Sequence, residues 1–407
     1  MIGRQGGKLV MRTVGTVARG IRAPIIKPGD DIINIVVESV LASAREDGFE
    51  LKDRDVIGIT ESLVARAQGN YATLQDIALD VKRKYEGDIA VLFPLLSRNR
   101  FLMILKAIAM SERKIHLVLN YPSDEVGNQL VCEDKMDELG IDPCTDILDE
   151  KKYRKLFGEE VLHPFTGIDY VKVYKEVAVN NNIEIYLANN PKVALNFSSE
   201  ILVANIHERR RTKKILQKAG AKTVYGLDKI LNEPVNGSGF NPEYGLLGSN
   251  KATENKVKLF PRNCFEITRS IQDAIRSRTG KNVEVLVYGD GAFKDPVGKI
   301  WELADPVVSP GYTDGLKGVP SELKLKFIVD SEMEGNNGKG EWEIDEIVRE
   351  KIKEKEGNLV GKNESLGTTP RQLTDLLGSL CDLISGSGDK GTPIVLIQGY
   401  FDNYATD

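Results

Sequence analysis

The stretch VEVLVYGDGAFKDPVGK, residues 283–299, combines a buried strand with a turn that could carry chemistry. Residues 283–288 are apolar apart from one glutamate, which is typical of a strand inside a sheet. Gly289, Asp290 and Gly291 follow as a turn at the carboxyl end of that strand. In open α/β sheets ligands bind at this end of the strands. The stretch therefore predicts a ligand site at Asp290, although an Asp-Gly pair also occurs in simple turns.

Four charged side chains around this turn suit a ligand that carries phosphate. Asp290 and Asp295 offer the oxygen ligands that hard divalent cations prefer, and Lys294 and Lys299 can neutralise phosphate oxygens. The three histidines and four cysteines are scattered, without the spacing of a metal cluster. Any metal ion should therefore be bound by oxygen, which indicates Mg²⁺ or Mn²⁺.

A second candidate face lies on the helix expected after Thr369 and Pro370, which suit the cap and the first position of a helix. Apolar residues at steps of three and four predict a core-facing stripe of Leu373, Leu376, Leu377, Leu380, Leu383 and Ile384. The other face holds Asp375, Gly378, Ser379 and Asp382. Its two carboxylates are about 10 Å apart along the helix axis. Carboxylates on a helix are usually solvated, but residues as small as Gly and Ser suggest that a ligand or another backbone approaches closely.

The order of strands and helices predicts an α/β protein. A short buried strand at 56–60 precedes a helical segment, and strand–helix units continue from about residue 95 to 239. We expect three parts: residues 1–94, a central α/β region at 95–240, and residues 241–407. The polar, glycine-rich stretch 331–341 is predicted to be an exposed loop.

Composition restricts the class of protein. The chain has 407 residues, 41% hydrophobic and 28% charged, which is ordinary for a soluble protein with more than one domain. A net charge of -5 disfavours general binding to nucleic acid or to an anionic membrane. No apolar run reaches the length of a membrane span, and the isolated cysteines fit a reducing compartment. We expect a cytoplasmic protein without nucleic-acid or membrane partners.

Three stretches together resemble the coenzyme F-420-0 γ-glutamyl ligase family. The first contains GIRAPIIKPGDDI and DVIGITESLVARAQGN, near the N-terminus. The second is the strand and aspartate turn at 283–299, and the third is TTPRQLTDLLGSLCDLISGSGDKGTPIVLIQGY near the C-terminus. The likeness covers roughly residues 12–93 and 241–402, and the central region has no counterpart that we recognise.

The resemblance implies a fold, a reaction and a site. It implies a mixed α+β ligase core with mixed sheets, interrupted by an inserted central region, and an intertwined homodimer. It implies that GTP and a divalent metal are used to join L-glutamate to a carboxylate acceptor, with a coenzyme F-420 precursor as the family's usual acceptor. Asp290 would bind metal directly, and Asp375 and Asp382 would hold a second ion or its waters. Lys294 and Asp295 would be catalytic, whereas nucleotide or substrate would be bound by Arg66, Lys299, Ser249 and Asn250.

The sequence departs from the family pattern at several positions. Leu247 stands where the family has an aspartate before a Ser-Asn pair, although Ser249 and Asn250 are retained. Ser62 replaces a lysine, and Arg66 keeps a cation nearby. Two other classes of function stay open at this point: a nucleotide or metabolite sensor without catalysis, and a metal-dependent phosphatase or phosphotransferase. Each basic residue can equally be an exposed surface charge.

Overall fold

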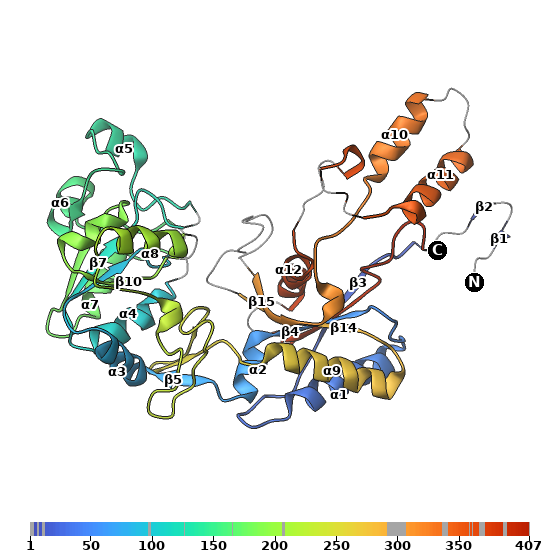
Figure 1. Cartoon of the computed structure of the whole chain (residues 1–407), viewed down its shortest axis with the longest axis horizontal. Coiled ribbons are helices and arrows are strands. Elements are labelled where there is room, and N and C mark those ends of the chain that lie inside the picture. The colour runs from blue at the N-terminus through green and yellow to red at the C-terminus, as the bar shows by residue number, and fades with distance from the viewer. Residues whose placement is uncertain are drawn as a thin grey trace.

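The computed structural model describes residues 4–5, 8–9, 13–96, 99–125, 127–164, 166–205, 208–290, 307–335, 341–357, 359, 361–365, 371–385 and 389–406. Two larger sheets lie at opposite ends of the molecule, and a small sheet lies between them (Figure 1). Within these ranges, every helix is too short or too polar to cross a membrane. The protein is thus of mixed α/β class, as the sequence predicts.

The first large sheet is assembled from widely separated parts of the chain. Its order is β15-β14-β4-β16-β3, with bounds Val307–Tyr312, Glu284–Asp290, Val56–Thr60, Ile394–Gln398 and Val17–Ile21. Strands β4 and β14 are parallel, and the other neighbouring pairs are antiparallel. The strands expected at residues 56–60 and 283–288 are therefore confirmed, and they are direct neighbours.

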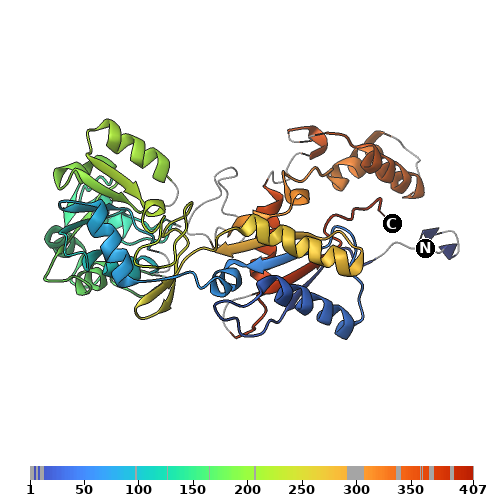
Figure 2. The same cartoon turned by 60° about the horizontal axis from the view of Figure 1, so that its bottom comes forward.

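Both faces of this sheet are covered by helices (Figures 1 and 2). Because successive strand residues point to opposite faces, Val285 and Val287 pack on one side while Leu286 and Tyr288 pack on the other. The first side is covered by α1, α2 and α9, with bounds Ile32–Asp47, Glu61–Ala67 and Cys264–Thr279. The second side is covered by α12, Leu373–Ser385.

Residues 89–226 form the second large sheet without strands from elsewhere. Its order is β11-β10-β6-β7-β9-β8, with bounds Thr223–Gly226, Glu200–Val203, Ile89–Leu92, Ile115–Leu119, Ile183–Leu187 and Leu148–Asp149. All neighbours are parallel except β8, which pairs antiparallel with β9. The helices of this part are α3 to α8, with bounds Leu74–Lys84, Phe101–Ala109, Glu133–Glu138, Glu150–Phe157, Tyr170–Glu176 and Arg209–Lys218. The predicted succession of strand–helix units is confirmed here.

A three-stranded sheet connects the two ends. Strands β12, β13 and β5 have the bounds Asn250–Thr253, Lys256–Lys258 and Tyr71–Thr73, and all pair antiparallel. Short 3-10 segments occur at Pro191–Asn196, Leu227–Lys229, Asp314–Leu316 and Asn363–Ser365. Near the N-terminus, the two-residue strands β1 (Arg4–Gln5) and β2 (Lys8–Leu9) pair antiparallel.

Helices α10 and α11 form a hairpin that projects from the end with the five-stranded sheet (Figure 1). They span Leu325–Gly335 and Glu341–Glu354 and bury a small core of their own around Ile328, Ile344 and Val348. The expectation of a loop over 331–341 is therefore wrong for residues 331–335, which continue α10, and for Glu341, which begins α11. Apolar packing of Ile328 against α11 outweighs the polar composition of that stretch.

Candidate functional site

The candidate site lies at one edge of the five-stranded sheet, where β4 and β14 reach their carboxyl ends. Thr60 of β4 is the register partner of Tyr288 in β14, so these parallel strands end side by side. The amino end of β16 lies at the same edge, because Ile394 is opposite both Ile59 and Ile21. At this edge Glu61 follows β4, Arg22 follows β3, Asp290 is the last residue of β14, and Thr392 shortly precedes β16. In open α/β sheets ligands bind at the carboxyl ends of the strands.

A buried ion pair lies directly beneath the end of β14. Lys258 Nζ donates to Glu61 Oε1 and Oε2 at 2.6 and 2.5 Å, and both side chains are less than 10% exposed. A side chain at Gly289 would collide with Cβ and Cγ of Glu61, so Gly289 allows the backbone before Asp290 to lie against Glu61. The sequence analysis missed this pair, although a glutamate directly after a buried strand was a possible signal.

Phe260 links the segment of Ser249 and Asn250 to the end of β14. Its ring lies 3.4 Å from the position that a Cβ of Gly289 would take, and it also occupies the space beside Gly248. Gly248 has a φ of 70°, in the left-handed region that favours glycine. Ser249 is buried, and Asn250 begins β12 with its Nδ2 at 3.5 Å from the carbonyl of Gly248. The structure thus brings Ser249 and Asn250 close to the end of β14.

Leu247, which stands where the family pattern has an aspartate, is buried. It is 4% exposed and belongs to the apolar core that extends into the second large sheet. A carboxylate there would be desolvated by its apolar neighbours. The leucine therefore has a packing role, and any oxygen ligands must come from other positions.

Helix α12 is held across the strands near this edge. Ser309 of β15 donates to the carbonyl of Thr374 at 3.3 Å, and Tyr288 donates to the carbonyl of Cys381 at 3.3 Å. Since Val307 is the register partner of Asp290, the start of α12 lies only a few residues from the end of β14. The stretches 283–290 and 371–385 therefore lie close together in space.

The carboxylate of Asp375 already has a strong partner. Arg371 Nε donates to Asp375 Oδ2 at 2.5 Å, and both side chains are less than 10% exposed. Asp382 lies two turns further along and is half-buried. Among the side chains that the structure describes, no three His, Cys, Asp or Glu residues gather as metal ligands. Metal binding by Asp375 and Asp382 stays a prediction.

Among the other predicted residues, the structure describes the side chain of Arg66. Arg66 is exposed in the last turn of α2 and donates to the carbonyl of Ile26 at 3.3 Å. Of Asp290 the structure describes the backbone, which ends β14. Lys294, Asp295 and Lys299 lie outside the described residues, so their predicted roles stay predictions.

Burial disfavours Cys264 as a nucleophile at this edge. Burial raises the pKa of its thiol to about 12, and the negative charges of Glu61 and Glu243 add to the effect. A thiol with this pKa is protonated at neutral pH, whereas the thiolate is the reactive form. Among the described residues, the groups at this edge that could take part in chemistry are carboxylates, cationic side chains, hydroxyls and backbone amides.

A sheet edge with these groups fits an enzyme that binds charged substrates without a cysteine nucleophile. The family model for F420-0:gamma-glutamyl ligase matches residues 20–399, nearly the whole chain. The chain therefore belongs to the F420-0:gamma-glutamyl ligase family, and this membership implies γ-glutamyl ligase activity. No curated protein sequence gives a significant match.

Proposed function

We propose that this protein is a GTP- and divalent-metal-dependent γ-glutamyl ligase that forms an amide bond through an acyl phosphate. The supporting observation is the meeting of Glu61, Gly248–Asn250 and the end of β14 at one sheet edge, in a chain that matches the ligase family over residues 20–399. A precursor of coenzyme F-420 is the acceptor we propose first, because the family model bears that name.

Two steps account for the reaction. A carboxylate oxygen of the acceptor attacks the γ-phosphorus of GTP, the bond to the bridging oxygen breaks, and GDP leaves. The amine of L-glutamate then attacks the acyl carbon and loses a proton, and inorganic phosphate departs as the amide forms. The protein contributes mainly by holding both reactants and by offsetting negative charge. We assign the latter role to Lys294, Lys299 and Arg66, with Asp295 beside the reacting groups.

The proposal includes a divalent metal ion, but the described side chains supply only part of a binding site for it. A bound Mg²⁺ or Mn²⁺ would neutralise charge on the nucleotide phosphates. The described side chains do not complete a site for the ion. Asp375 is paired with Arg371, and no group of three or more His, Cys, Asp or Glu residues forms among the described side chains. Asp290 is therefore the first candidate ligand, and Asp382 is the second.

The test measures all products of the reaction and compares their amounts. The purified chain is incubated with GTP, Mn²⁺, L-glutamate and the F-420 precursor, and the release of GDP and phosphate is compared with the mass of the acceptor. We expect one added glutamyl unit for each GDP. Phosphate release that ignores glutamate would support a phosphatase, and nucleotide binding without turnover would support a sensor.

Asp290→Asn is the first variant to measure. We expect it to reduce turnover by at least about a hundredfold, the usual scale for losing a group that stabilises the transition state, with little change in melting temperature. Asp273→Asn is the matched control, because Asp273 is exposed on α9 and pairs only with Arg276 among described residues. Unchanged turnover in Asp290→Asn would remove Asp290 from the site.

A further inference from the structure

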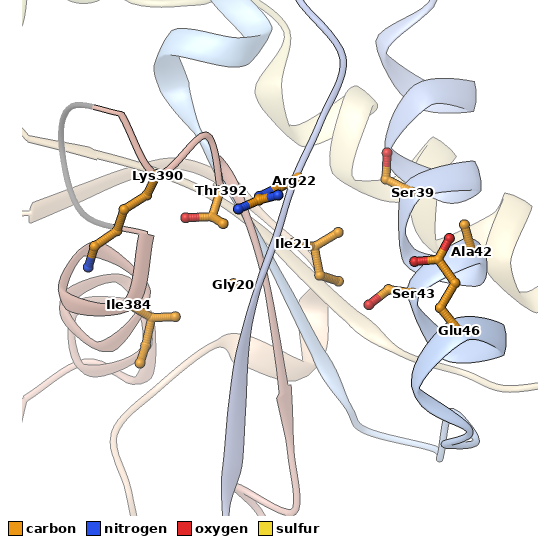
Figure 3. Close-up of a pocket in the computed structure, with 10 residues that line it drawn as sticks. All are labelled: Gly20, Ile21, Arg22, Ser39, Ala42, Ser43, Glu46, Ile384, Lys390 and Thr392. Atoms are coloured by element: carbon orange, nitrogen blue, oxygen red, sulfur yellow. The ribbon is translucent and has the colours of Figure 1, made fainter.

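A pocket of about 690 Å³ lies at the free edge of β3 and is lined from both faces of the sheet (Figure 3). Strand β3 is outermost in the five-stranded sheet and pairs only with β16 in the part of the chain that the structure describes. Helix α1 borders the pocket on one face, and the end of α12 with the turn before β16 borders it on the other. The pocket therefore lies where a sixth strand of this sheet would be.

The backbone of β3 presents hydrogen-bonding groups to this pocket. In an antiparallel sheet, alternate residues of a strand bond to opposite neighbours. Thr60 N of β4 donates to the carbonyl of Pro393 at 3.0 Å, so odd-numbered residues of β16 bond to β4 and even-numbered ones bond to β3. The partners of these even-numbered residues in β3 are residues 17, 19 and 21. The N–H and C=O groups of Ala18 and Gly20 therefore point away from β16 to the free edge, and Gly20 lines the pocket.

The two faces of the pocket differ in charge. Side chains of β3 alternate between the faces, and Ile21 packs in the core under α1, so Arg22 points to the α12 face. On that face Arg22 and Lys390 are two exposed cations, and Thr392 adds a hydroxyl (Figure 3). The pocket residues of the α1 face are three small side chains and one exposed carboxylate, Ser39, Ala42, Ser43 and Glu46.

We propose that this pocket binds an extended peptide segment of a partner protein, which joins β3 as a sixth strand and carries acidic side chains at alternate positions. In strand addition, main-chain bonds supply affinity and alternate side chains supply specificity. Side chains of the segment that point to the α12 face meet Arg22 and Lys390, which favours acidic residues there. Side chains that point to the α1 face meet small residues and Glu46, which favours short uncharged residues. This docking goes beyond the proposed catalysis and does not depend on it.

A peptide of four Thr-Glu repeats, acetylated and amidated, is the probe for this site. Threonine favours extended backbone, and its short side chain suits the α1 face. Fluorescence anisotropy of the labelled peptide should give a dissociation constant of roughly 0.1 mM, because a few main-chain bonds and exposed charges each contribute modestly. A peptide of four Thr-Lys repeats should bind at least about tenfold more weakly. The proposal is overturned if the Thr-Glu peptide does not bind up to about 2 mM.

Charge reversal tests the α12 face. The double variant Arg22→Glu/Lys390→Glu should weaken binding of the Thr-Glu peptide about tenfold and strengthen binding of the Thr-Lys peptide. Arg45→Glu is the matched control, because Arg45 is exposed on α1 and does not line the pocket. If the control weakens binding as much as the double variant does, the attraction is general to the surface and the docking site is wrong.

N-methylated peptides test the pairing of strands itself. A methyl group on a peptide nitrogen removes a main-chain donor, and only alternate nitrogens of the segment face β3. Methylation of one alternate set should abolish binding, whereas methylation of the other set should change the dissociation constant by no more than about twofold. Equal losses from the two sets would show that the peptide does not bind as a strand.

Hydrogen exchange locates the peptide on the chain. The amides of Ala18 and Gly20 should exchange more slowly with the Thr-Glu peptide bound, whereas the amide of Arg19, which bonds to β16, should change little. If the first two amides are protected in the free chain and lose this protection on dilution, a second copy of the chain occupies the edge and the proposal is wrong. Protection in the free chain at every concentration would mean that another part of the same chain covers β3, which also overturns it.

Discussion

At the scale of single residues, the pair of Glu61 and Lys258 is the most consequential feature that the sequence analysis overlooked. The pair joins the start of α2 to β13 and so fixes the small sheet against the end of β14. Two buried charges are costly to desolvate, and their attraction offsets that cost only while both are present. The pair should therefore matter for stability as well as for the shape of the site.

Lys258→Met should lower the free energy of unfolding by about 3–5 kcal/mol, because it leaves a carboxylate buried without its lysine. Replacing both residues, with Met at 258 and Leu at 61, should recover much of this loss, since an apolar pair avoids the desolvation of charge. Urea denaturation followed by circular dichroism measures both values. Lys251→Met is the control, because Lys251 pairs with Glu254 in the open and its loss should leave the midpoint nearly unchanged. A double variant less stable than Lys258→Met would contradict this account.

At the scale of elements, α12 shows how far the sequence could predict the structure. The spacing of its leucines predicts a helix, and the helix is present at Leu373–Ser385. The predicted stripe is only partly confirmed: Leu377 is buried, whereas Leu383 is 59% exposed. The buried residues also include Gly378 and Ser379, so this part of the face expected to be polar is covered.

The reason for the partial failure is physical. Hydrophobic periodicity reports where large apolar side chains lie, but a helix that packs closely across a sheet needs small residues at the contact, and these carry little hydrophobic signal. Cys381 illustrates this, because its sulfur fills the space above Gly58 in the neighbouring sheet. The Asp-Gly turn is a local pattern, and it predicted the end of a strand. The ion pair of Glu61 with Lys258 joins positions far apart in the sequence, so no local pattern could predict it.

Gly58→Ala tests this close contact. A methyl group at position 58 would collide with Sγ of Cys381, and overpacking of this kind typically lowers the free energy of unfolding by about 1–3 kcal/mol. The double variant Gly58→Ala/Cys381→Ala removes the sulfur and should recover part of the loss. Gly15→Ala serves as control, since nothing lies within 4 Å of its Cβ position. Equal stability of Gly58→Ala and the wild-type chain, measured by urea denaturation, would mean that α12 does not need this contact.

At the scale of the whole molecule, the chain passes between the two large sheets at two adjacent points. Leu259 N donates to the carbonyl of Asn70 at 2.9 Å, and Asn70 Nδ2 donates to the carbonyl of Phe260 at 2.6 Å. The two sheets contribute to separate buried clusters on either side of these points. We therefore propose that the unit boundaries lie near residues 71 and 258, which would widen the central region expected at 95–240.

Removal of residues 72–257 tests this division. Tyr71 and Lys258 are register partners in neighbouring antiparallel strands, so a short Asn-Gly turn can join them without moving either strand. Glu61 keeps its lysine, and Asn70 keeps Phe260. We expect the shortened chain to unfold cooperatively in urea, with a smaller denaturant dependence in proportion to the surface that it no longer buries. Residues 72–257 expressed alone should also unfold cooperatively, because the second large sheet draws all its strands from within that range. If the shortened chain lacks a cooperative transition while the separate segment has one, the five-stranded sheet depends on the central region, and the insertion boundaries are wrong.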